Sequence, residues 1–429
     1  MDKVDVIIVG GGLAGLSCAY ELADSGMTVL VLERGNFSGS KNVTGGRIYL
    51  APIRKYLPDI WKEAPLERHV TKEFITLMGE TNSTTFELYS DRFNRPPYPS
   101  YTILRAKFDR WFADLVSEKG IFIIPQKAVD DLIREGEKVI GIKAGDEEIG
   151  ADCVVAADGI LSFMAEKAGL RQPLKPHSFA LGFKEVIEFD PRTIEDRFRL
   201  GEGEGAAQLF VGSLTKGMMG GGFLYTNKDS LSLGLVIGLH SLNMREPREE
   251  VYKLLDQFKE RPEIKNLIRG GNTVEYSAHL INEGGIQIKP QLYGDGILLV
   301  GDAAGLGLNM LVTVRGMEYA MVSGVLAGRA IKKAKEKNDF SALSLAEYEK
   351  LLNESFILKE MNTFKNTPAI LRNERLFTKY PQVISDIFEK VMHVDENPKE
   401  GIYKTKMEEL KKHFLNFETL KDWWQFRKS

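Results

Sequence analysis

Three glycines near the N-terminus, Gly10, Gly12 and Gly15, have the G-x-G-x-x-G spacing of a dinucleotide-binding turn. In such a turn the first glycine permits a tight bend, the second lets the backbone approach a pyrophosphate, and the third lets a helix pack against the preceding strand. Leu13 and Ala14 lie within the same turn, where the free N–H groups of a helix N-terminus attract negative charge. The spacing therefore predicts a site for a phosphate-bearing cofactor.

The residues around these glycines supply the elements that would position them. Apolar, β-branched residues precede Gly10 as a strand, and apolar residues at helical spacing follow Gly15 as far as Gly26. A second strand ends in Glu33, about 20 residues after the last glycine, where an acid can accept hydrogen bonds from ribose hydroxyls. Because a carboxylate repels a 2′-phosphate, NADP is disfavoured, but this unit alone leaves both FAD and NAD open.

A second strand, glycine-rich turn and helix occupy residues 298–324 and favour FAD. Gly301 and Asp302 follow the strand and begin a turn of small residues, and we expect a helix after this turn. FAD continues beyond its pyrophosphate into a ribityl chain and a flavin ring, which need support of their own. Asp302 is suited to accept hydrogen bonds from ribityl hydroxyls, and the helix N-terminus would stabilise negative charge on the flavin. The alternative, that Asp302 only caps the helix, stays open.

Several stretches of the chain resemble those of known flavoproteins. The first glycine turn, "VVAADGILS" at 154–162 and "VGDAAG" at 300–305 resemble the three FAD signatures of glutathione-reductase/para-hydroxybenzoate-hydroxylase-like proteins. Four further stretches resemble the FixC-type electron-transfer-flavoprotein:quinone oxidoreductases: "GSKNVTGGRIY" at 39–49, "YTILRAKFDRWFA" at 101–113, "GGGFLYTNKDSLSLGLVIGL" at 220–239 and "NMLVTVRGMEYAMVSG" at 309–324. The likeness runs in order over nearly the whole chain.

The resemblance implies a set of FAD contacts beyond the first turn. Between residues 34 and 47 these contacts are Arg34, Lys41, Asn42, Gly45, Gly46 and Arg47. Arg105 would lie near the phosphates and the ribityl chain, the backbone of Ala128 and Val129 at the adenine, and Asp158 and Gly159 in the segment that packs the dinucleotide fold around the cofactor. Around the second turn the contacts are Gly301, Asp302, Asn309 and Gly316. Two of these have simpler interpretations, since Arg105 could be a solvated helix charge and Asp158 could cap a turn. No residue can be named as a general base.

By the same family analogy, four apolar residues would lie nearest the flavin and line a channel for a quinone: Phe223, Leu224, Met310 and Leu311. Ordinary core packing is the competing interpretation for each of them.

The pattern of elements predicts an α/β protein built on a Rossmann-type FAD-binding fold. The FAD-binding domain is expected to be discontinuous, made of residues 1–73, 100–170 and 291–337. Residues 74–99 and 171–290 alternate apolar and polar positions, which predicts a mostly antiparallel sheet in a substrate domain. Residues 338–429 are expected to form a helical C-terminal region.

Composition limits the partners and the location. The chain has 429 residues and a formal net charge of −3, which gives no basic face for nucleic acid. Its longest uncharged run, 6–20, is too short to span a bilayer, so we expect a cytoplasmic protein, with peripheral contact with the cytoplasmic face of a membrane left open. The six histidines show no metal-ligand spacing, so no metal site is assigned.

Only two cysteines occur, Cys18 and Cys153, and they cannot hold a four-cysteine iron–sulfur cluster. Animal-type members of the resembled family carry such a cluster in a C-terminal domain. The resemblance to the FixC-type arrangement therefore implies a separate small ferredoxin-like iron–sulfur protein as a partner.

The expected function is FAD-dependent electron transfer, in which the protein accepts electrons from an electron-transfer flavoprotein and passes them to a quinone, a ferredoxin-like partner, or both. The alternative enzyme classes are a geranylgeranyl-reductase-like enzyme and another FAD-dependent small-molecule oxidoreductase or monooxygenase. A geranylgeranyl reductase usually carries an aromatic-Trp-Phe-Pro motif where this chain has "GGFLYTNKDS", which lacks tryptophan and proline. A flavin-binding scaffold without turnover is the third, non-enzymatic hypothesis.

Overall fold

The computed structural model describes residues 2–41, 46–173, 175–399, 401, 419, 421–422, 424 and 427. Asn42 and Gly45, two predicted flavin-loop residues, lie outside this set. The chain forms two compact units. Unit 1 comprises Met1–Glu67, Tyr98–Phe179 and His279–Lys365, and unit 2 comprises Arg68–Pro97, Ala180–Ala278 and Asn366–Ser429. The helical region expected over 338–429 is thus divided between the two units.

Unit 1 is built on a largely parallel sheet. Its strands run in the order β16-β17-β10-β1-β2-β7, and β9 pairs with both β10 and β8. The strand bounds are β1 Asp2–Val9, β2 Val29–Leu32, β7 Phe122–Ile124, β8 Asp131–Glu135, β9 Lys138–Ala144, β10 Glu147–Ala156, β16 Tyr293–Gly294 and β17 Ile297–Leu299. The pairings of β1 with β2 and β10, and of β10 with β17, are parallel. Parallel order brings the carboxyl ends of these strands to one edge of the sheet, where ligands bind in such folds.

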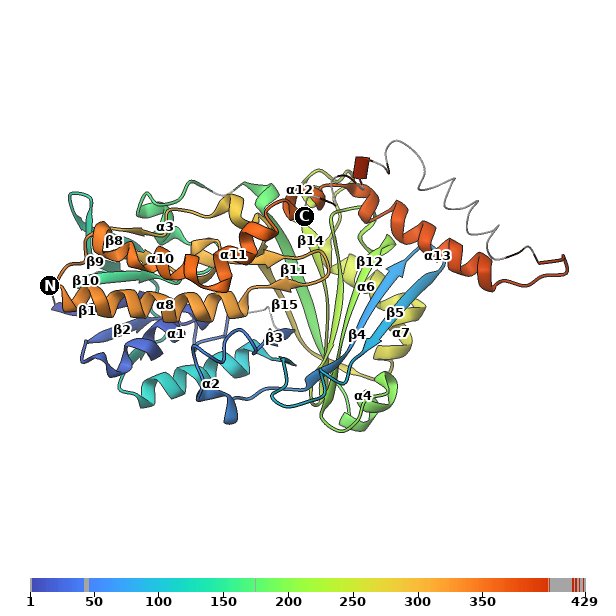
Figure 1. The fold of residues 1–429 in the computed structure, drawn as a ribbon, viewed down its shortest axis with the longest axis horizontal. Helices are drawn as coiled ribbons and strands as arrows, with labels where there is room; N and C mark the ends of the chain where they lie inside the picture. The colour runs from blue at the N-terminus through green and yellow to red at the C-terminus, as the bar shows by residue number, and fades with distance from the viewer. Residues whose placement is uncertain are drawn as a thin grey trace. The chain divides into compact units, whose positions relative to one another are not determined.

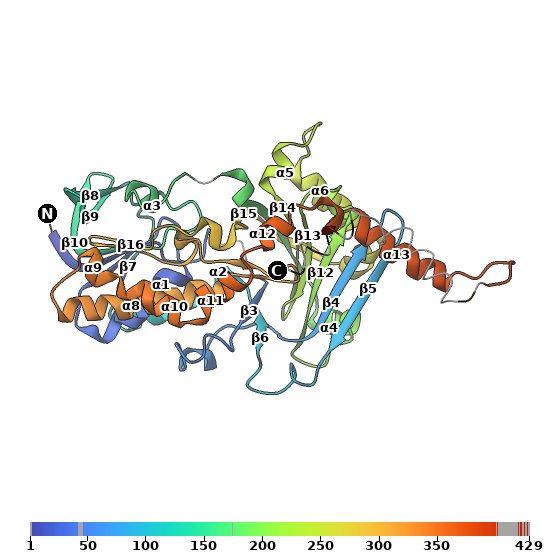
Figure 2. The same cartoon turned by 45° about the horizontal axis from the view of Figure 1, so that its top comes forward.

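Short strand pairs and helices complete unit 1. The strands are β3 Arg47–Tyr49, β6 Ser100–Thr102, β18 Leu308–Asn309 and β19 Val314–Arg315, and the helices are α1 Leu13–Leu22, α2 Arg105–Glu118, α3 Phe163–Lys167, α8 Met317–Glu336, α9 Ala342–Leu345, α10 Glu347–Glu354 and α11 Phe356–Thr363. Helices α1 and α8 run side by side (Figures 1 and 2). They approach closely because α8 carries Gly324, where a Cβ would stand 2.1 Å from the Ala14 carbonyl oxygen.

The central strands of unit 1 are buried, as expected for a parallel sheet covered by helices. Val6, Ile7 and Ile8 of β1 are fully buried, and so are Val154 and Val155 of β10. These short, β-branched runs are the ones that predicted strands, because such side chains pack well between two helical layers.

Unit 2 contains a twisted, mostly antiparallel sheet. Its order is β15-β11-β14-β13-β12-β4, with β5 beside β4, and the pairing of β12 with β4 is parallel. The bounds are β4 His69–Met78, β5 Ser83–Tyr89, β11 Phe179–Glu188, β12 Glu204–Gly212, β13 Gly220–Thr226, β14 Ser230–Gly238, β15 Asn272–Asn282, α4 Pro191–Phe198, α5 Leu239–Asn243, α6 Val251–Glu260, α7 Pro262–Ile268, α12 Thr367–Ile370 and α13 Lys379–Met392. Alternation along β13 sends successive side chains to opposite faces of the sheet.

One face of the unit 2 sheet packs on helices around a core that includes Phe183, Phe210 and Phe258. The rings of Phe210 and Phe258 meet edge to face at 5.1 Å. Helix α13 packs across β4 and β5 (Figures 1 and 2). Within the described residues, no helix has the length and apolar character needed to cross a membrane.

Candidate functional site

The first glycine turn has the geometry that its spacing predicts. Gly10 has φ +112°, and a Cβ there would stand 2.3 Å from the Ala157 carbonyl oxygen. A Cβ on Gly15 would stand 2.1 Å from the Gly10 carbonyl oxygen, so both positions require glycine. Gly12 precedes α1 and brings no side chain to cap it. The backbone N–H groups that open α1 are therefore suited to bind an anion.

Glu33 directly follows β2 and lies beside this turn. Its Oε2 accepts a hydrogen bond from the N–H of Gly11 at 2.8 Å, and its Oε1 accepts one from the N–H of Gly35 at 2.6 Å. Next to it, the N–H of Lys127 donates to the Glu33 carbonyl at 2.9 Å. This pairing places the segment that continues into Ala128 and Val129 alongside Glu33, although the two segments are far apart in the sequence.

Two serines that the sequence analysis did not single out lie over the same turn. The hydroxyls of Ser38 and Ser40 are buried and have no hydrogen-bond partner among the residues that the structure describes. A Cβ on Gly11 would stand 2.6 Å from Ser38 Oγ, and one on Gly35 would stand 2.2 Å from Ser40 Oγ. Unpartnered buried hydroxyls against a glycine cradle fit the polar phosphate and ribose groups of FAD. The signal that could have found them is the pair of hydroxyls in the glycine-containing stretch "GNFSGS".

The second glycine turn packs directly on the first. A Cβ on Gly301 would stand 2.7 Å from the Cβ of Ala14, and the Gly301 N–H donates to Ser323 Oγ of α8 at 2.9 Å. The helix expected after this turn is present, but it does not begin at Asp302, as capping by that residue would require. Residues Gly301–Ala304 form a 3-10 turn that ends at Gly305 with φ +68°, and α8 begins only at Met317. The two turns thus form one packed structure, which explains why the chain carries both.

Arg105 opens α2 and is held by an acid one turn along the helix. Its Nε and Nη2 donate to the two carboxylate oxygens of Asp109, each at 2.7 Å. Burial alone would lower the pKa of Arg105, but Asp109 and the charge of Asp302 raise it. Burial raises the pKa of Asp302, and Arg105 counteracts that rise. The loop after Glu33 reaches the same place, since a Cβ on Gly39 would stand 2.8 Å from Asp109 Cβ.

Other predicted contact residues have structural partners. Asp158 accepts hydrogen bonds from Ser162 Oγ at 2.7 Å and from the N–H of Met164 at 3.1 Å, so it organises the start of α3. Gly159 beside it has φ +80°. Arg47 donates to Ser100 Oγ at 2.9 Å, and its guanidinium lies 4.5 Å from the centre of the Tyr49 ring.

The remaining predicted positions of unit 1 differ in exposure. Arg34 and Lys41 are exposed, whereas Gly46 is buried and its carbonyl accepts the N–H of Ile103 at 3.1 Å. Gly316 is the residue that precedes α8.

Asn309, another predicted contact, binds a residue that the sequence analysis missed. Its amide Nδ2 donates to Glu283 Oε2 at 2.9 Å, and its Oδ1 accepts from the N–H of Leu311 at 2.8 Å. Glu283 is 5% exposed, and burial raises its pKa to about 7. A buried acid with such a pKa is typical of functional sites. The sequence offered little signal for it, because Glu283 is a lone acid in the glycine-containing stretch "NEGG".

The four predicted channel residues are divided between the two units and differ in burial. Phe223 and Leu224 are neighbours on β13 of unit 2, so they point to opposite faces, and Leu224 is fully buried in the core of that unit. In unit 1, Met310 packs against the core, whereas Leu311 is 40% exposed and has φ +70°. Of the two β13 residues, therefore, only Phe223 remains available to a ligand.

Comparisons with known proteins agree with this geometry. Residues 5–91, which contain the first glycine turn, match the family model of FAD dependent oxidoreductases. Residues 179–281 match the ETF-QO, ubiquinone-binding model, and residues 367–429 match the ETF-QO/FixC family C-terminal domain. The probable electron transfer flavoprotein-quinone oxidoreductase YdiS of Escherichia coli K12 is 43% identical over 96% of this chain and 95% of its own. The chain belongs to the ETF-quinone oxidoreductase/FixC family.

Two further relatives support the assignment to the ETF-quinone oxidoreductase/FixC family. The protein FixC of Escherichia coli K12 is 43% identical over 92% of this chain and 91% of its own, and that of Azotobacter vinelandii is 40% identical over 98% and 96%. A geranylgeranyl bacteriochlorophyll reductase-like structure from Thermoplasma acidophilum has a TM-score of 0.74 at 22% identity, covering 98% of this chain and 99% of that one. The latter likeness shows the fold alone.

The family assignment confirms several predictions made from the sequence. This ETF-quinone oxidoreductase/FixC family member is an FAD-dependent electron-transfer oxidoreductase with an α/β FAD-binding fold. When bound, FAD supplies the redox chemistry of this family member. Within the described residues, no cluster of acids, histidines and cysteines could hold a metal ion.

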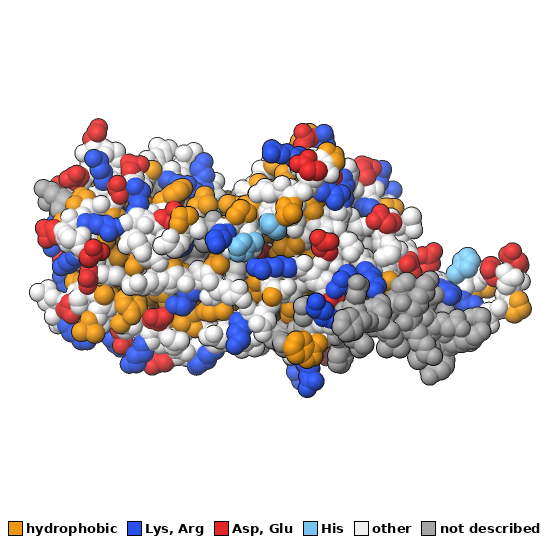
Figure 3. All heavy atoms as spheres, turned by 90° about the horizontal axis from the view of Figure 1, so that it is seen from above, with side chains coloured by type: hydrophobic (Ala, Val, Ile, Leu, Met, Phe, Trp, Pro, Cys, Tyr) orange, Lys and Arg blue, Asp and Glu red, His pale blue; other side chains and the backbone are white. Residues whose placement is uncertain are grey.

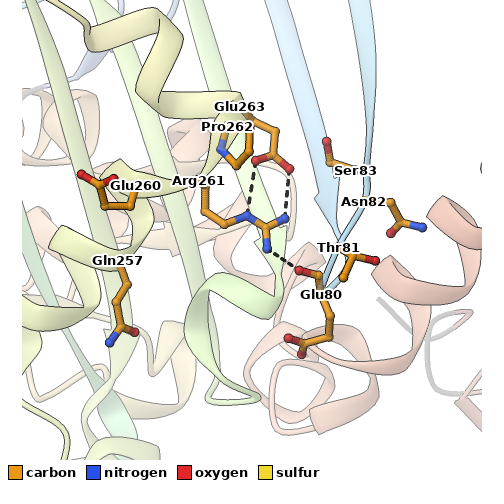
Figure 4. Close-up of a pocket in the computed structure, with 9 residues that line it drawn as sticks. All are labelled: Glu80, Thr81, Asn82, Ser83, Gln257, Glu260, Arg261, Pro262 and Glu263. Carbon is orange, nitrogen blue, oxygen red and sulfur yellow. Dashed lines mark hydrogen bonds and ion pairs between the residues drawn. The ribbon is translucent and has the colours of Figure 1, made fainter.

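Unit 2 of this family member also contains a pocket of about 620 Å³, which is lined by polar and charged residues: Glu80, Thr81, Asn82, Ser83, Gln257, Glu260, Arg261, Pro262 and Glu263 (Figure 4). Arg261 donates to Glu263 Oε1 at 2.9 Å and to the Glu80 carbonyl at 2.8 Å. This lining does not suit an apolar ligand. On the face drawn in Figure 3, the described acidic and basic side chains are intermingled rather than gathered by sign.

Replacing Glu33 with alanine is expected to weaken FAD binding by roughly 10- to 100-fold, because a charged acceptor contributes about 1.5–3 kcal/mol through its hydrogen bonds. Its loss also frees the N–H groups of Gly11 and Gly35 that shape the turn. FAD titration followed by flavin fluorescence measures the effect. Glu147→Ala is the matched control, since that carboxylate is 65% exposed in an ion pair with Lys127. Equal affinity of the Glu33 variant and the wild type would contradict the ribose role.

Proposed function

We propose that this protein accepts electrons from an electron-transfer flavoprotein through its FAD and passes them to a quinone. The match of residues 179–281 to the ETF-QO, ubiquinone-binding model carries the proposal. The relative of Escherichia coli K12 that is 43% identical is named for the same electron donor and acceptor. The proposed FAD contacts are those of the two glycine turns, with Glu33, Arg105 and Asp302 around them.

The hairpin between β18 and β19 supports the choice of an apolar acceptor. Its turn exposes Leu311, Val312 and Val314, which are 40%, 58% and 45% exposed. Grouped exposed apolar side chains mark binding surfaces. A long-chain quinone resides in the bilayer, so we place the protein in the cytoplasm in peripheral contact with the membrane.

The proposal extends to a second protein partner. Both cysteines of the sequence are buried and unpaired, so a cluster that needs four cysteines would have to be held elsewhere. We assign that role to a separate small ferredoxin-like iron–sulfur protein, which takes electrons from this chain or returns them.

Anaerobic mixing with chemically reduced electron-transfer flavoprotein tests the donor. The FAD absorbance of this protein should bleach, and a quinone analogue should restore it. If reduced flavoprotein leaves the FAD oxidised, the proposal fails. Reduction by NAD(P)H with oxygen consumption, or transfer of hydrogen to an isoprenoid double bond, would instead favour the two alternative enzyme classes.

Leu311→Asp is expected to leave FAD content unchanged and to reduce turnover with a long-chain quinone about tenfold or more. A carboxylate beside an apolar ligand costs more than about 1.4 kcal/mol, the equivalent of a tenfold change. The backbone should tolerate the change, because Leu311 has φ +70°, a region that Asp adopts more readily than Leu. Steady-state quinone reduction measures it, with Leu343→Asp as the control because Leu343 is 87% exposed on α9. Equal losses of quinone reduction and of electron entry would show damage to the flavin site instead.

A further inference from the structure

Glu283 is a buried acid of unit 1 whose two carboxyl oxygens differ in their hydrogen bonds. Its Oε2 accepts the hydrogen bond from Asn309, while its Oε1 is buried and has no hydrogen-bond partner in the described part of the chain. The carboxyl is 5% exposed. An ionised carboxylate with an unpaired oxygen in such surroundings is costly, and a protonated one would have an O–H group free to donate.

The segment around Glu283 is bound to the loop that follows the second glycine turn. Asn282 Nδ2 donates to the Gly305 carbonyl at 2.8 Å, and the Gly284 N–H donates back to Asn282 Oδ1 at 2.9 Å. Gly305 ends the turn that contains Asp302, and that turn packs on Ala14 of α1 through Gly301. Glu283 therefore belongs to the packed structure that carries the two cofactor turns.

Asn309 fixes the orientation of the carboxyl. Its Oδ1 is engaged by the N–H of Leu311, so its Nδ2 must point to Glu283. An amide nitrogen can only donate, which leaves Oε2 as an acceptor and Oε1 as the atom that carries a proton. The site for a proton on Glu283 is thus defined by hydrogen bonding.

The charged and titratable groups on neighbouring segments have other partners. Lys289 binds Glu349 at 2.8 Å, and Arg315 of β19 binds Glu360 at 2.7 Å. His177, next to the Ser178 carbonyl that accepts the Glu283 N–H, is exposed.

Two further titratable groups, His279 and Asp302, have pKa shifts whose causes do not include Glu283. Burial lowers the pKa of His279, and Arg105 and Arg34 lower it further, whereas Asp302 is paired electrostatically with Arg105. Within the described residues, burial raises the pKa of Glu283 and Asn309 lowers it, with no charge among the causes. Glu283 is therefore free to respond to a charge that arrives with electrons.

We propose that Glu283 takes up one proton when the FAD of this protein receives an electron pair and releases it when the pair leaves. The added negative charge disfavours the carboxylate, because like charges in a buried site raise a carboxyl pKa. The proton comes from solvent and forms an O–H bond at Oε1. The same bond breaks on reoxidation, and the proton leaves with the acceptor or returns to solvent. The electrons come from the donor of the reaction, so atoms and charge balance.

Redox titration of the FAD-loaded protein between about pH 6 and about pH 9 tests the proposal. Uptake of one additional proton per electron pair makes the slope of the midpoint potential against pH steeper by about 30 mV per pH unit. Above about pH 7, where the oxidised protein holds Glu283 as carboxylate, the wild type should be steeper than Glu283→Gln by this amount. Below that pH both should have the same slope. Glu349→Gln, a change at the partner of Lys289, is the control and should match the wild type throughout.

Parallel plots for the wild type and Glu283→Gln over the whole range would overturn the proposal. Glu283→Asp keeps an ionisable group and should restore the steeper slope, which a purely structural role would not predict. If the Gln variant loses FAD, infrared difference spectra of the wild type test the proposal instead. Reduction above about pH 7 should produce the band of a protonated carboxyl group, and the absence of this band would contradict the proposal. Because a chemical reductant is used, failure of this proposal is distinguishable from failure of the proposed donor and quinone.

Discussion

Replacing Gly324 with alanine is expected to destabilise the protein by about 3 kcal/mol, at the upper end of the usual cost of overpacking. A Cβ at this position would stand 2.1 Å from the Ala14 carbonyl oxygen and 2.9 Å from the Cys18 backbone nitrogen. Backbone atoms cannot rotate away, so α1 and α8 must separate. Because Ala14 lies in the first glycine turn, the same displacement should reduce FAD occupancy. Urea unfolding of the FAD-saturated protein and the flavin-to-protein absorbance ratio measure the two effects.

Gly328→Ala is the matched control, one turn further along α8. The new Cβ would stand 2.8 Å from Cγ and 2.9 Å from Cβ of Glu21, and 3.3 Å from the nearest backbone atom, the Cys18 carbonyl oxygen, so its contacts are less severe than the 2.1 Å contact at Gly324. Alanine also favours a helix over glycine by about 1 kcal/mol, a gain that both variants share. We therefore expect Gly328→Ala to be less destabilising than Gly324→Ala by about 1 kcal/mol or more and to keep its FAD. If Gly324→Ala were as stable as Gly328→Ala, the direct backbone contact between α1 and α8 would be wrong.

Glu283→Gln is expected to gain stability relative to the wild type as the pH rises. Burial raises the folded-state pKa of Glu283 to about 7 from an ordinary value of 4.5. The contribution of Glu283 to the free energy of unfolding is therefore greatest below about pH 4.5, where the carboxyl is neutral in both the folded and the unfolded protein. This contribution is lost as the pH rises from there through about 7. Gln has no proton to lose, so the difference in the free energy of unfolding should grow by about 2–3 kcal/mol between about pH 5 and about pH 8.

Urea unfolding of both proteins at a series of pH values measures that difference. Glu349→Gln serves again as the control, because its carboxylate lies at the surface with Lys289 and should give a nearly constant difference. A constant difference for Glu283→Gln as well would mean that the carboxyl is ionised or solvated in the folded protein.

Much of the first turn could be predicted because its determinants are contiguous. Gly10, Gly12 and Gly15 have the predicted strand before them and the predicted helix after them, and Glu33 directly follows the next strand. Each of these choices depends on local backbone sterics and on apolar periodicity, which a short stretch of sequence displays in full. Recognition of the family rested likewise on motifs that keep their order along the chain.

The second turn was predicted less well. The strand before Gly301 is present, but a 3-10 turn and a short hairpin precede the expected helix, which begins only at Met317. Gly305 with φ +68° ends the turn, and the glycines that follow favour no helix. Similarly, alternation on β13 placed Leu224 in the core of unit 2, whereas family analogy had suggested that it lines a channel together with Phe223.

Residue order alone was enough to predict a dinucleotide cofactor at Gly10–Gly15 and Glu33, to favour FAD because a second turn exists, and to exclude a four-cysteine cluster on two cysteines. Four features became visible only in the folded chain: the packing of the two turns through Gly301 and Gly324, the ion pair of Arg105 with Asp109, the hydroxyls of Ser38 and Ser40 that lack a partner among the described residues, and the buried acid Glu283 bound to Asn309. The difference follows from distance along the chain. Close backbone approach, desolvation and unsatisfied hydrogen bonds arise between segments up to about 300 residues apart, and no local pattern of side chains records them.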